Sequence, residues 1–176
     1  MPQSHKKQLL SGLFWFLVGQ IGYITVGLIS NIVLARLLTV YEFGQMGIVL
    51  FFILVARVLT DAGLGGALVR NNKATQKDYS TIFIFNLIVS FALMVTIMLS
   101  SKAIAYYYGD VELKNILIAS SLIILINAFQ LVQSARLVKN MEFRKKALYD
   151  FIAILIASIV AIIFAIKGFG VWSIVI

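Results

Sequence analysis

The residues that this chain lacks exclude several kinds of site. There is no cysteine in the 176 residues, and the one histidine is His5. Without cysteine the chain can form neither disulfides nor thiolate metal sites, and one histidine cannot build a metal cluster. The sequence also has no nucleotide-binding loop, no metal-ligand spacing and no nucleophile–base pair. It therefore predicts a protein that is not an enzyme and that holds no metal or other cofactor.

Charge is scarce as well. Charged residues make up 12% of the chain and hydrophobic residues 61%, whereas soluble domains have about 25% and 45–50%. One soluble core of this size could not bury so much apolar surface. A helix needs about 20 apolar residues to cross a bilayer, and the strand alternation of a β-barrel is absent. We expect five complete spans and the start of a sixth, at 13–34, 43–60, 81–99, 116–137, 148–166 and 170–176.

These spans define the expected fold. We predict an all-α, polytopic transmembrane helical bundle that forms a single transmembrane domain over residues 1–176, with antiparallel neighbours. Short turns at 39–42, 69–80, 101–115, 137–147 and 167–170 leave no room for a second domain. Glycines at 63, 65 and 66 either end the second helix or permit a bend there.

The positive charge lies in alternate loops. The net charge is +8, but the basic residues do not gather on one face, which argues against a nucleic-acid partner. Because loops rich in Lys and Arg stay cytoplasmic, the N-terminus and the second and fourth turns are predicted to be inside. Ten of the 15 basic residues lie there: Lys6, Lys7, Arg70, Lys73, Lys77, Arg136, Lys139, Arg144, Lys145 and Lys146. The opposite loops carry Arg36, Lys102, Lys114 and Lys167.

Two ionisable residues lie toward the cytoplasmic end of the second span. Arg57 and Asp61 are four residues apart and share one face of a helix. Ionisable groups in a span are costly in lipid and usually face protein or a water-filled cavity. Two interpretations stay open. Either the two residues form a local ion pair that reaches the inner interface, or Arg57 lines a cavity and meets an anion while Asp61 orients it.

Uncharged polar residues form stripes on other spans. Gln20, Gly27 and Asn31 fall on one face of the first span at about 100° per residue. Asn127, Gln130 and Ser134 do the same on the fourth, and Asn86 and Ser90 on the third. Each stripe could simply join two helices. Together they also suggest one shared polar interior.

Short strings at five places in the chain resemble landmarks of polysaccharide flippases, in the same order. They are LARLL at 34–38 with YEFG at 41–44, DAGLGGALVR at 61–70, YYGD at 107–110, MEFR at 141–144 and KGFGVW at 167–172. These strings cover nearly the whole chain. On them the chain resembles the oligosaccharide flippase (Wzx-like, lipopolysaccharide-biosynthesis) branch of the multidrug/oligosaccharidyl-lipid/polysaccharide exporter superfamily.

The resemblance implies two lobes of about twelve to fourteen helices in all around a central cavity. This chain would be most of the N-terminal lobe. Such proteins flip undecaprenyl-diphosphate-linked oligosaccharide across the bacterial cytoplasmic (inner) membrane for O-antigen, capsule or exopolysaccharide. The implied partners are this lipid-linked oligosaccharide, membrane lipids, and polysaccharide polymerase and chain-length proteins. Cationic cavity residues receive the diphosphate. The expected substrate-binding residues here are Arg57, Asp61, Gln20, Asn31, Asn127 and Gln130.

Two other functions remain as alternatives. One is a cation-coupled drug exporter of the same superfamily, which would be expected to use buried carboxylates. The spans hold one deep carboxylate, Asp61, beside Arg57, and this favours an anionic substrate. The other is a non-transporting membrane scaffold or partner subunit. A second set of about six spans beyond Ile176 would support a transporter.

Overall fold

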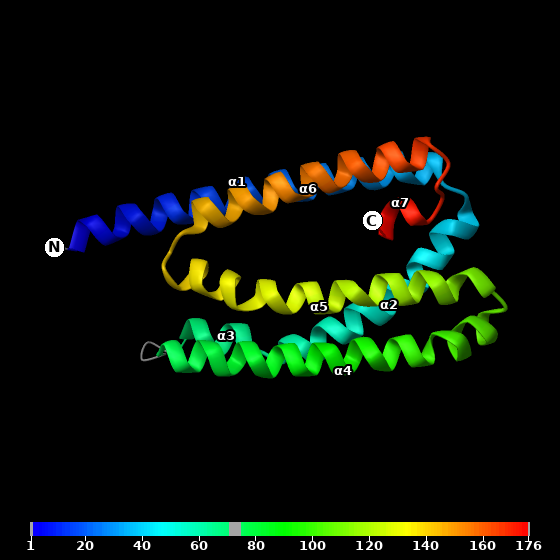
Figure 1. Ribbon diagram of the computed structural model, residues 1–176. Coiled ribbons are helices and arrows are strands. Elements are labelled where there is room, and N and C mark those ends of the chain that lie inside the picture. The colour runs from blue at the N-terminus through cyan, green and yellow to red at the C-terminus, as the bar shows by residue number, and fades with distance from the viewer. Residues whose placement is uncertain (1, 71–74, 176) are drawn as a thin grey trace. The chain divides into compact units, whose positions relative to one another are not determined.

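The computed structural model describes residues 2–70 and 75–175, with side chains from Phe14 onward (Figure 1). Lys73 and the side chains of His5, Lys6 and Lys7 lie outside the described residues. The described helices are α1 (Pro2–Leu37), α2 (Val40–Asp61), α3 (Leu64–Arg70), α4 (Gln76–Tyr108), α5 (Val111–Lys139), α6 (Phe143–Ile166) and α7 (Trp172–Val175).

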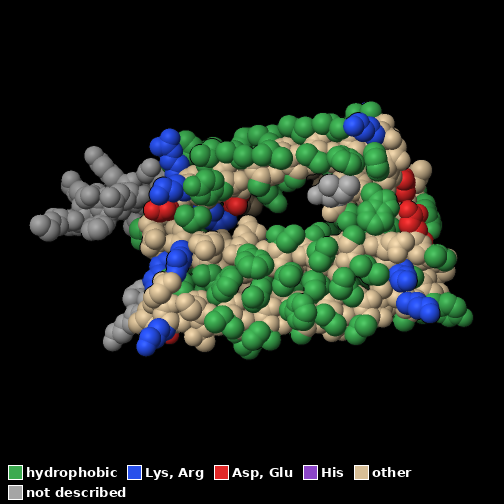
Figure 2. Space-filling model, in the orientation of Figure 1, with side chains coloured by type: hydrophobic (Ala, Val, Ile, Leu, Met, Phe, Trp, Pro, Cys, Tyr) green, Lys and Arg blue, Asp and Glu red, His purple; other side chains and the backbone are tan. Residues whose placement is uncertain are grey.

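Five helical segments are long and apolar enough to cross a membrane. They are Phe14–Leu37, Val40–Arg70, Gln76–Tyr108, Val111–Lys139 and Phe143–Ile166. On the face in view, hydrophobic side chains cover the lengths of the helices, while Lys, Arg, Asp and Glu gather near the helix ends (Figure 2). The predicted all-α polytopic membrane fold is thereby confirmed.

The helices extend further than hydropathy predicted. The 33 residues of α4 span about 50 Å at 1.5 Å per residue, more than the hydrocarbon core of about 30 Å. The predicted loop at 101–115 is therefore wrong, because only Gly109 and Asp110 separate α4 from α5. Apolar content marks the part of a helix inside lipid, whereas the helix itself continues until a residue stops it. Gly109 does so here, in the left-handed conformation with φ 67°.

At the N-terminus and before α6, the helices also extend beyond the apolar stretches predicted from the sequence. The helix α1 begins at Pro2, so the expected polar tail is helical, and only residues 140–142 separate α5 from α6. The contacts of the chain form two compact units. Unit 1 combines residues 1–39 with 136–174, and unit 2 comprises residues 40–135. The single transmembrane domain stays a prediction.

Unit 1 is built on the pair α1 and α6, which lie side by side (Figure 1). A Cβ added to Gly19 would lie 2.4 Å from the Cβ of Ala147, and one on Gly22 would lie 3.2 Å from the ring of Phe151. Further along, Leu34 packs with Ala165. Residue numbers rise together along this seam, so the two helices run parallel. The predicted antiparallel packing of neighbours does not apply to α1 and α6, because they hold the first and fifth spans, which cross the membrane in the same direction.

Unit 2 contains α2, α3, α4 and most of α5. Asn86 of α4 donates its side-chain N–H to the carbonyl of Ala128 in α5 at 3.5 Å, and the rings of Phe83 and Phe129 meet edge to face at 5.7 Å. The numbers rise in opposite directions, so α4 and α5 are antiparallel. At one end Leu68 of α3 packs in a cluster with Tyr79, Val132 and Ala135.

The second span is broken near its end. After Asp61 the chain leaves the helix with Ala62 at φ 37° and Gly63 at φ 77°, and α3 restarts at Leu64. Positive φ is readily adopted by glycine because it has no Cβ. Both outcomes expected at these glycines occur, because α2 ends before Gly63 and the positive φ angles turn the chain into α3.

Candidate transport site

The two ionisable residues of the second span lie on one exposed face of α2. Arg57 and Asp61 are both exposed, whereas Ala56 and Thr60, on the adjacent face of the same turns, are buried. Asp61 does not pair with Arg57. Its Oδ1 accepts a long hydrogen bond from the backbone N–H of Gly65, 3.4 Å away across the break. Within the described residues, the Arg57 guanidinium has no carboxylate partner.

The lack of a described carboxylate partner matters because Arg57 lies within a span. Arg57 lies one turn before the end of α2 at Asp61, within the apolar segment Val40–Arg70. An arginine within a span is costly when it faces lipid, so such groups usually face protein or water. The local ion pair, one of the two interpretations of Arg57 and Asp61, is not formed. Arg57 is exposed, and its binding of an anion stays a prediction.

The polar stripe of α5 lies at the level of the α2–α3 break. A Cβ on Gly65 would be 3.9 Å from Cγ of Leu131, and Leu131 directly follows Gln130 and is one turn from Asn127. Asn127 is half-buried and Gln130 exposed, and both lie off the buried stripe that includes Ala128. Unit 2 therefore brings the Asp61 end of α2 to the same level as the two predicted amides of α5.

The predicted residues of α1 belong to unit 1. Gln20 and Asn31 are exposed, and nothing lies within 4 Å of a Cβ built on Gly27 between them. This stripe flanks the seam with α6, in which Gly19 approaches Ala147 and Leu34 packs with Ala165. Both amides are exposed, and their position relative to Arg57 stays a prediction.

The polar stripe of α4 proves to be an interhelical contact. Asn86 and Ser90 share a face, as predicted, and each is 0% exposed. The amide of Asn86 reaches a carbonyl of α5. The side-chain oxygens of Asn86 and Ser90 are buried without a hydrogen-bond partner. These two residues join helices inside unit 2 and do not line an open face.

One polar cluster escaped the sequence analysis. Asp110, between α4 and α5, accepts a hydrogen bond from Gln45 Nε2 of α2 at 2.6 Å and another from the hydroxyl of Tyr41. Its other oxygen accepts from the backbone N–H groups of Glu112 and Leu113 at 3.0 and 3.2 Å, which caps α5. Burial raises the pKa of Asp110, but the hydrogen bonds from Gln45, Tyr41 and the backbone outweigh it and hold the pKa below 3.8.

This Asp110 cluster joins two of the short strings from the sequence. Tyr41 begins the YEFG string, and Asp110 ends the YYGD string. An aspartate directly after a glycine and before a helical run is a recognisable N-cap signal. The long-range partner on α2 had no such signal. Among the described residues, no group of three His, Cys, Asp or Glu could hold a metal ion.

Comparison with known proteins gives consistent matches. The family model described as "Polysaccharide biosynthesis protein" matches residues 33–176. The chain is 26% identical over 172 residues to the succinoglycan biosynthesis transport protein ExoT of Rhizobium meliloti, covering 98% of this chain and 35% of that protein. It is 23% identical over 152 residues to the lipopolysaccharide biosynthesis protein WzxC of Escherichia coli, covering 86% of this chain and 31% of that protein.

A third relative is the teichuronic acid biosynthesis protein TuaB of Bacillus subtilis, 27% identical over 113 residues, or 64% of this chain and 23% of that protein. The chain thus spans about a third or less of the length of these relatives. No solved structure matches it significantly. The family match covers most of the chain, from the end of the first span to Ile176. The chain is therefore a multi-pass membrane protein that belongs to the polysaccharide biosynthesis protein family.

Proposed function

We propose that this chain is part of a transporter that flips undecaprenyl-diphosphate-linked oligosaccharide across the bacterial cytoplasmic membrane for surface polysaccharide synthesis. The observation that carries the proposal is the match over 98% of the chain to a protein named for succinoglycan transport. The family description and the name of the lipopolysaccharide relative agree with it. In this proposal the N-terminus and the basic turns are cytoplasmic.

Arg57 is the proposed receptor for the lipid diphosphate. An arginine guanidinium carries a positive charge and presents paired N–H groups that match two phosphate oxygens. It has no carboxylate partner among the described residues. An anion that enters from the aqueous side would therefore not have to displace an internal ion pair. Binding the diphosphate would neutralise a charge that is otherwise costly within a span.

The neighbouring polar residues have complementary roles in this proposal. The amides of Asn127 and Gln130 offer both donors and acceptors, which suits sugar hydroxyls. Gln20 and Asn31 offer the same chemistry on α1. Asp61 fixes the start of α3 through Gly65, so it shapes the mouth of the site and does not hold Arg57.

The test uses the complete gene product in a strain that lacks the gene. Arg57→Ala should lower surface polysaccharide by about 10- to 100-fold, since a hydrogen-bonded charge contributes about 1.5–3 kcal/mol. Lipid-linked oligosaccharide should accumulate. Arg57→Lys keeps the positive charge but loses the paired N–H groups of the guanidinium, so it should lower surface polysaccharide less than Arg57→Ala does. Asp61→Asn keeps an acceptor for Gly65 and should have a small effect. Lys102→Ala, an exposed cation at the end of α4, is the matched control.

Membrane levels of every variant are to be matched by immunoblotting. Normal surface polysaccharide from a well-expressed Arg57→Ala variant would refute the role of Arg57 in transport. An unchanged pool of lipid-linked oligosaccharide in a strain that lacks the whole gene would refute the proposed function itself.

A further inference from the structure

The end of unit 1 where two spans begin carries a cluster of aromatic rings and one arginine. The guanidinium carbon of Arg144 lies 4.8 Å from the centre of the Trp15 ring, and the rings of Phe16 and Phe143 meet edge to face at 6.3 Å. The spans predicted from the sequence begin at residues 13 and 148, so Trp15 lies near the start of the first and Arg144 just before the start of the other. The cluster therefore lies at the level where hydrocarbon gives way to headgroups, which is where tryptophan is enriched.

The charges around the cluster are not equivalent. Lys145 pairs with Glu142 at 3.0 Å, and Lys146 pairs with Asp150. In the described part of the chain, Arg144 has no carboxylate partner, and its recorded contact is the face of Trp15. Stacking occupies the face of a guanidinium and leaves its N–H groups, which lie in the plane, free to donate.

We propose that Arg144, held against Trp15, forms a binding site for the phosphodiester headgroup of an anionic phospholipid such as phosphatidylglycerol. The N–H edge of the guanidinium donates to two phosphate oxygens. The acyl chains lie along the apolar flank of α1, where Phe14 is 62% and Leu17 56% exposed.

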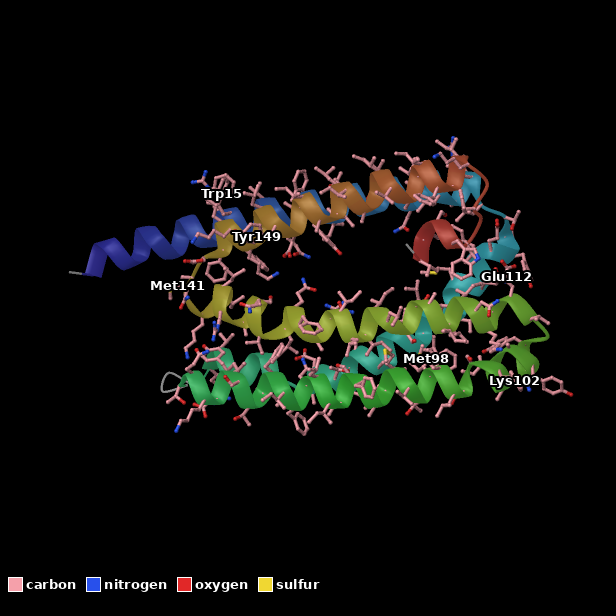
Figure 3. The ribbon with its side chains drawn as sticks, in the orientation of Figure 1. Trp15, Met98, Lys102, Glu112, Met141 and Tyr149 are labelled. Carbon is pink, nitrogen blue, oxygen red and sulfur yellow. The ribbon has the colours of Figure 1, made fainter. Side chains whose placement is uncertain are left out.

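The surroundings fit a lipid and not a soluble anion. Trp15 is partly exposed, and Met141 and Tyr149, both well exposed, lie toward the same end of unit 1 (Figure 3). Exposed apolar side chains beside a cation give a surface that is apolar on one side and charged on the other. This inference is independent of the transported substrate, because it uses residues of α1, of α6 and of the turn before α6, and none of the proposed substrate-binding residues.

The experiment uses Trp15 as its own probe. Trp172→Phe leaves Trp15 as the sole tryptophan of the chain. The chain is reconstituted in phosphatidylcholine bilayers with either brominated phosphatidylglycerol or brominated phosphatidylcholine, and quenching of Trp15 fluorescence reports the lipid in contact. We expect phosphatidylglycerol to bind about fivefold better, the ratio that about 1 kcal/mol per basic residue gives. Arg144→Ala should reduce this ratio to about one, and Arg144→Lys to an intermediate value.

Two controls separate a site from general attraction. Lys145→Ala removes an equal charge at the next residue, and Lys167→Ala removes one at the far end of α6. Both should keep the preference for phosphatidylglycerol. Equal quenching by the two brominated lipids overturns the proposal. So does a preference that survives Arg144→Ala, or one that Lys145→Ala reduces as much as Arg144→Ala does.

Discussion

Replacing Gly19 with alanine should force α1 and α6 apart. The added Cβ would lie 2.4 Å from the Cβ of Ala147 and 3.2 Å from its Cα, whereas ordinary contact begins at 3.4 Å. The obstacle is the root of a side chain and cannot rotate away. The helices must therefore separate by about 1 Å at this point, a gap that forfeits a quarter to a half of the attraction between facing atoms.

The magnitude follows from two opposing terms. Overpacking a tight contact costs about 1–3 kcal/mol, while Gly to Ala in a helix contributes up to about 1 kcal/mol of stability. Gly27→Ala in the same helix should gain the helix propensity of alanine without the overpacking cost, because nothing lies within 4 Å of a Cβ added at Gly27. We expect Gly19→Ala to be less stable than Gly27→Ala by about 1–3 kcal/mol.

The assay is unfolding of the chain in mixed detergent micelles with increasing dodecyl sulfate, followed by tryptophan fluorescence. The exchange variant Gly19→Ala/Ala147→Gly keeps the composition and moves the methyl group from one helix to the other. It should recover most of the stability that Gly19→Ala loses, so that the double-mutant cycle gives a coupling of about 1–3 kcal/mol. Equal stability of Gly19→Ala and Gly27→Ala would refute the close approach.

The remaining predictions concern topology and two local structures. The chain has no cysteine, so cysteines introduced one at a time at Tyr107, Lys77 and Lys145 can be labelled in intact cells with an impermeant thiol reagent. Only the cysteine at position 107 should react. Labelling at position 77 or 145 would contradict the predicted topology. Asp110→Ala should destabilise unit 2 by about 0.5–2 kcal/mol near neutral pH through loss of the cap. The folded-state pKa of Asp110 is lowered from 3.8, so its contribution to stability is present above pH 3.8 and is lost as the pH falls through the folded-state pKa. The difference in unfolding free energy between the wild type and Asp110→Ala should therefore narrow at low pH. A difference that does not change with pH would contradict the role of the Asp110 carboxylate as the cap of α5. Gly63→Ala should cost about 1–2 kcal/mol in the same assay, since φ is 77° at this position; an unchanged midpoint would show that the break does not need glycine.

The sequence predicted the helical membrane fold because apolar length is a direct physical requirement of the bilayer. It also located the break after Asp61, since Gly63 is suited to positive φ. It placed the helix ends less well, because a helix continues past the hydrocarbon until a residue such as Gly109 stops it.

The candidate site was partly predictable. Helical spacing put Arg57 and Asp61 on one face, and the structure agrees. Spacing could not show that Asp61 would turn to Gly65, because that contact depends on the geometry of the break. The link from Gln45 to Asp110 joins residues far apart in the chain, and no local pattern encodes such a partner.

The parallel pairing of α1 with α6 has a consequence for biogenesis. Gly19 meets Ala147 only after all of unit 2 has been synthesised, which at about 5–20 residues per second takes on the order of 10 seconds. During that time α1 must remain in the membrane with its small-residue seam uncovered, while α2 to α5 complete their own contacts. An insertase or another helix that shields this seam would determine whether the nascent chain pairs with its own α6 or with the α1 of another molecule.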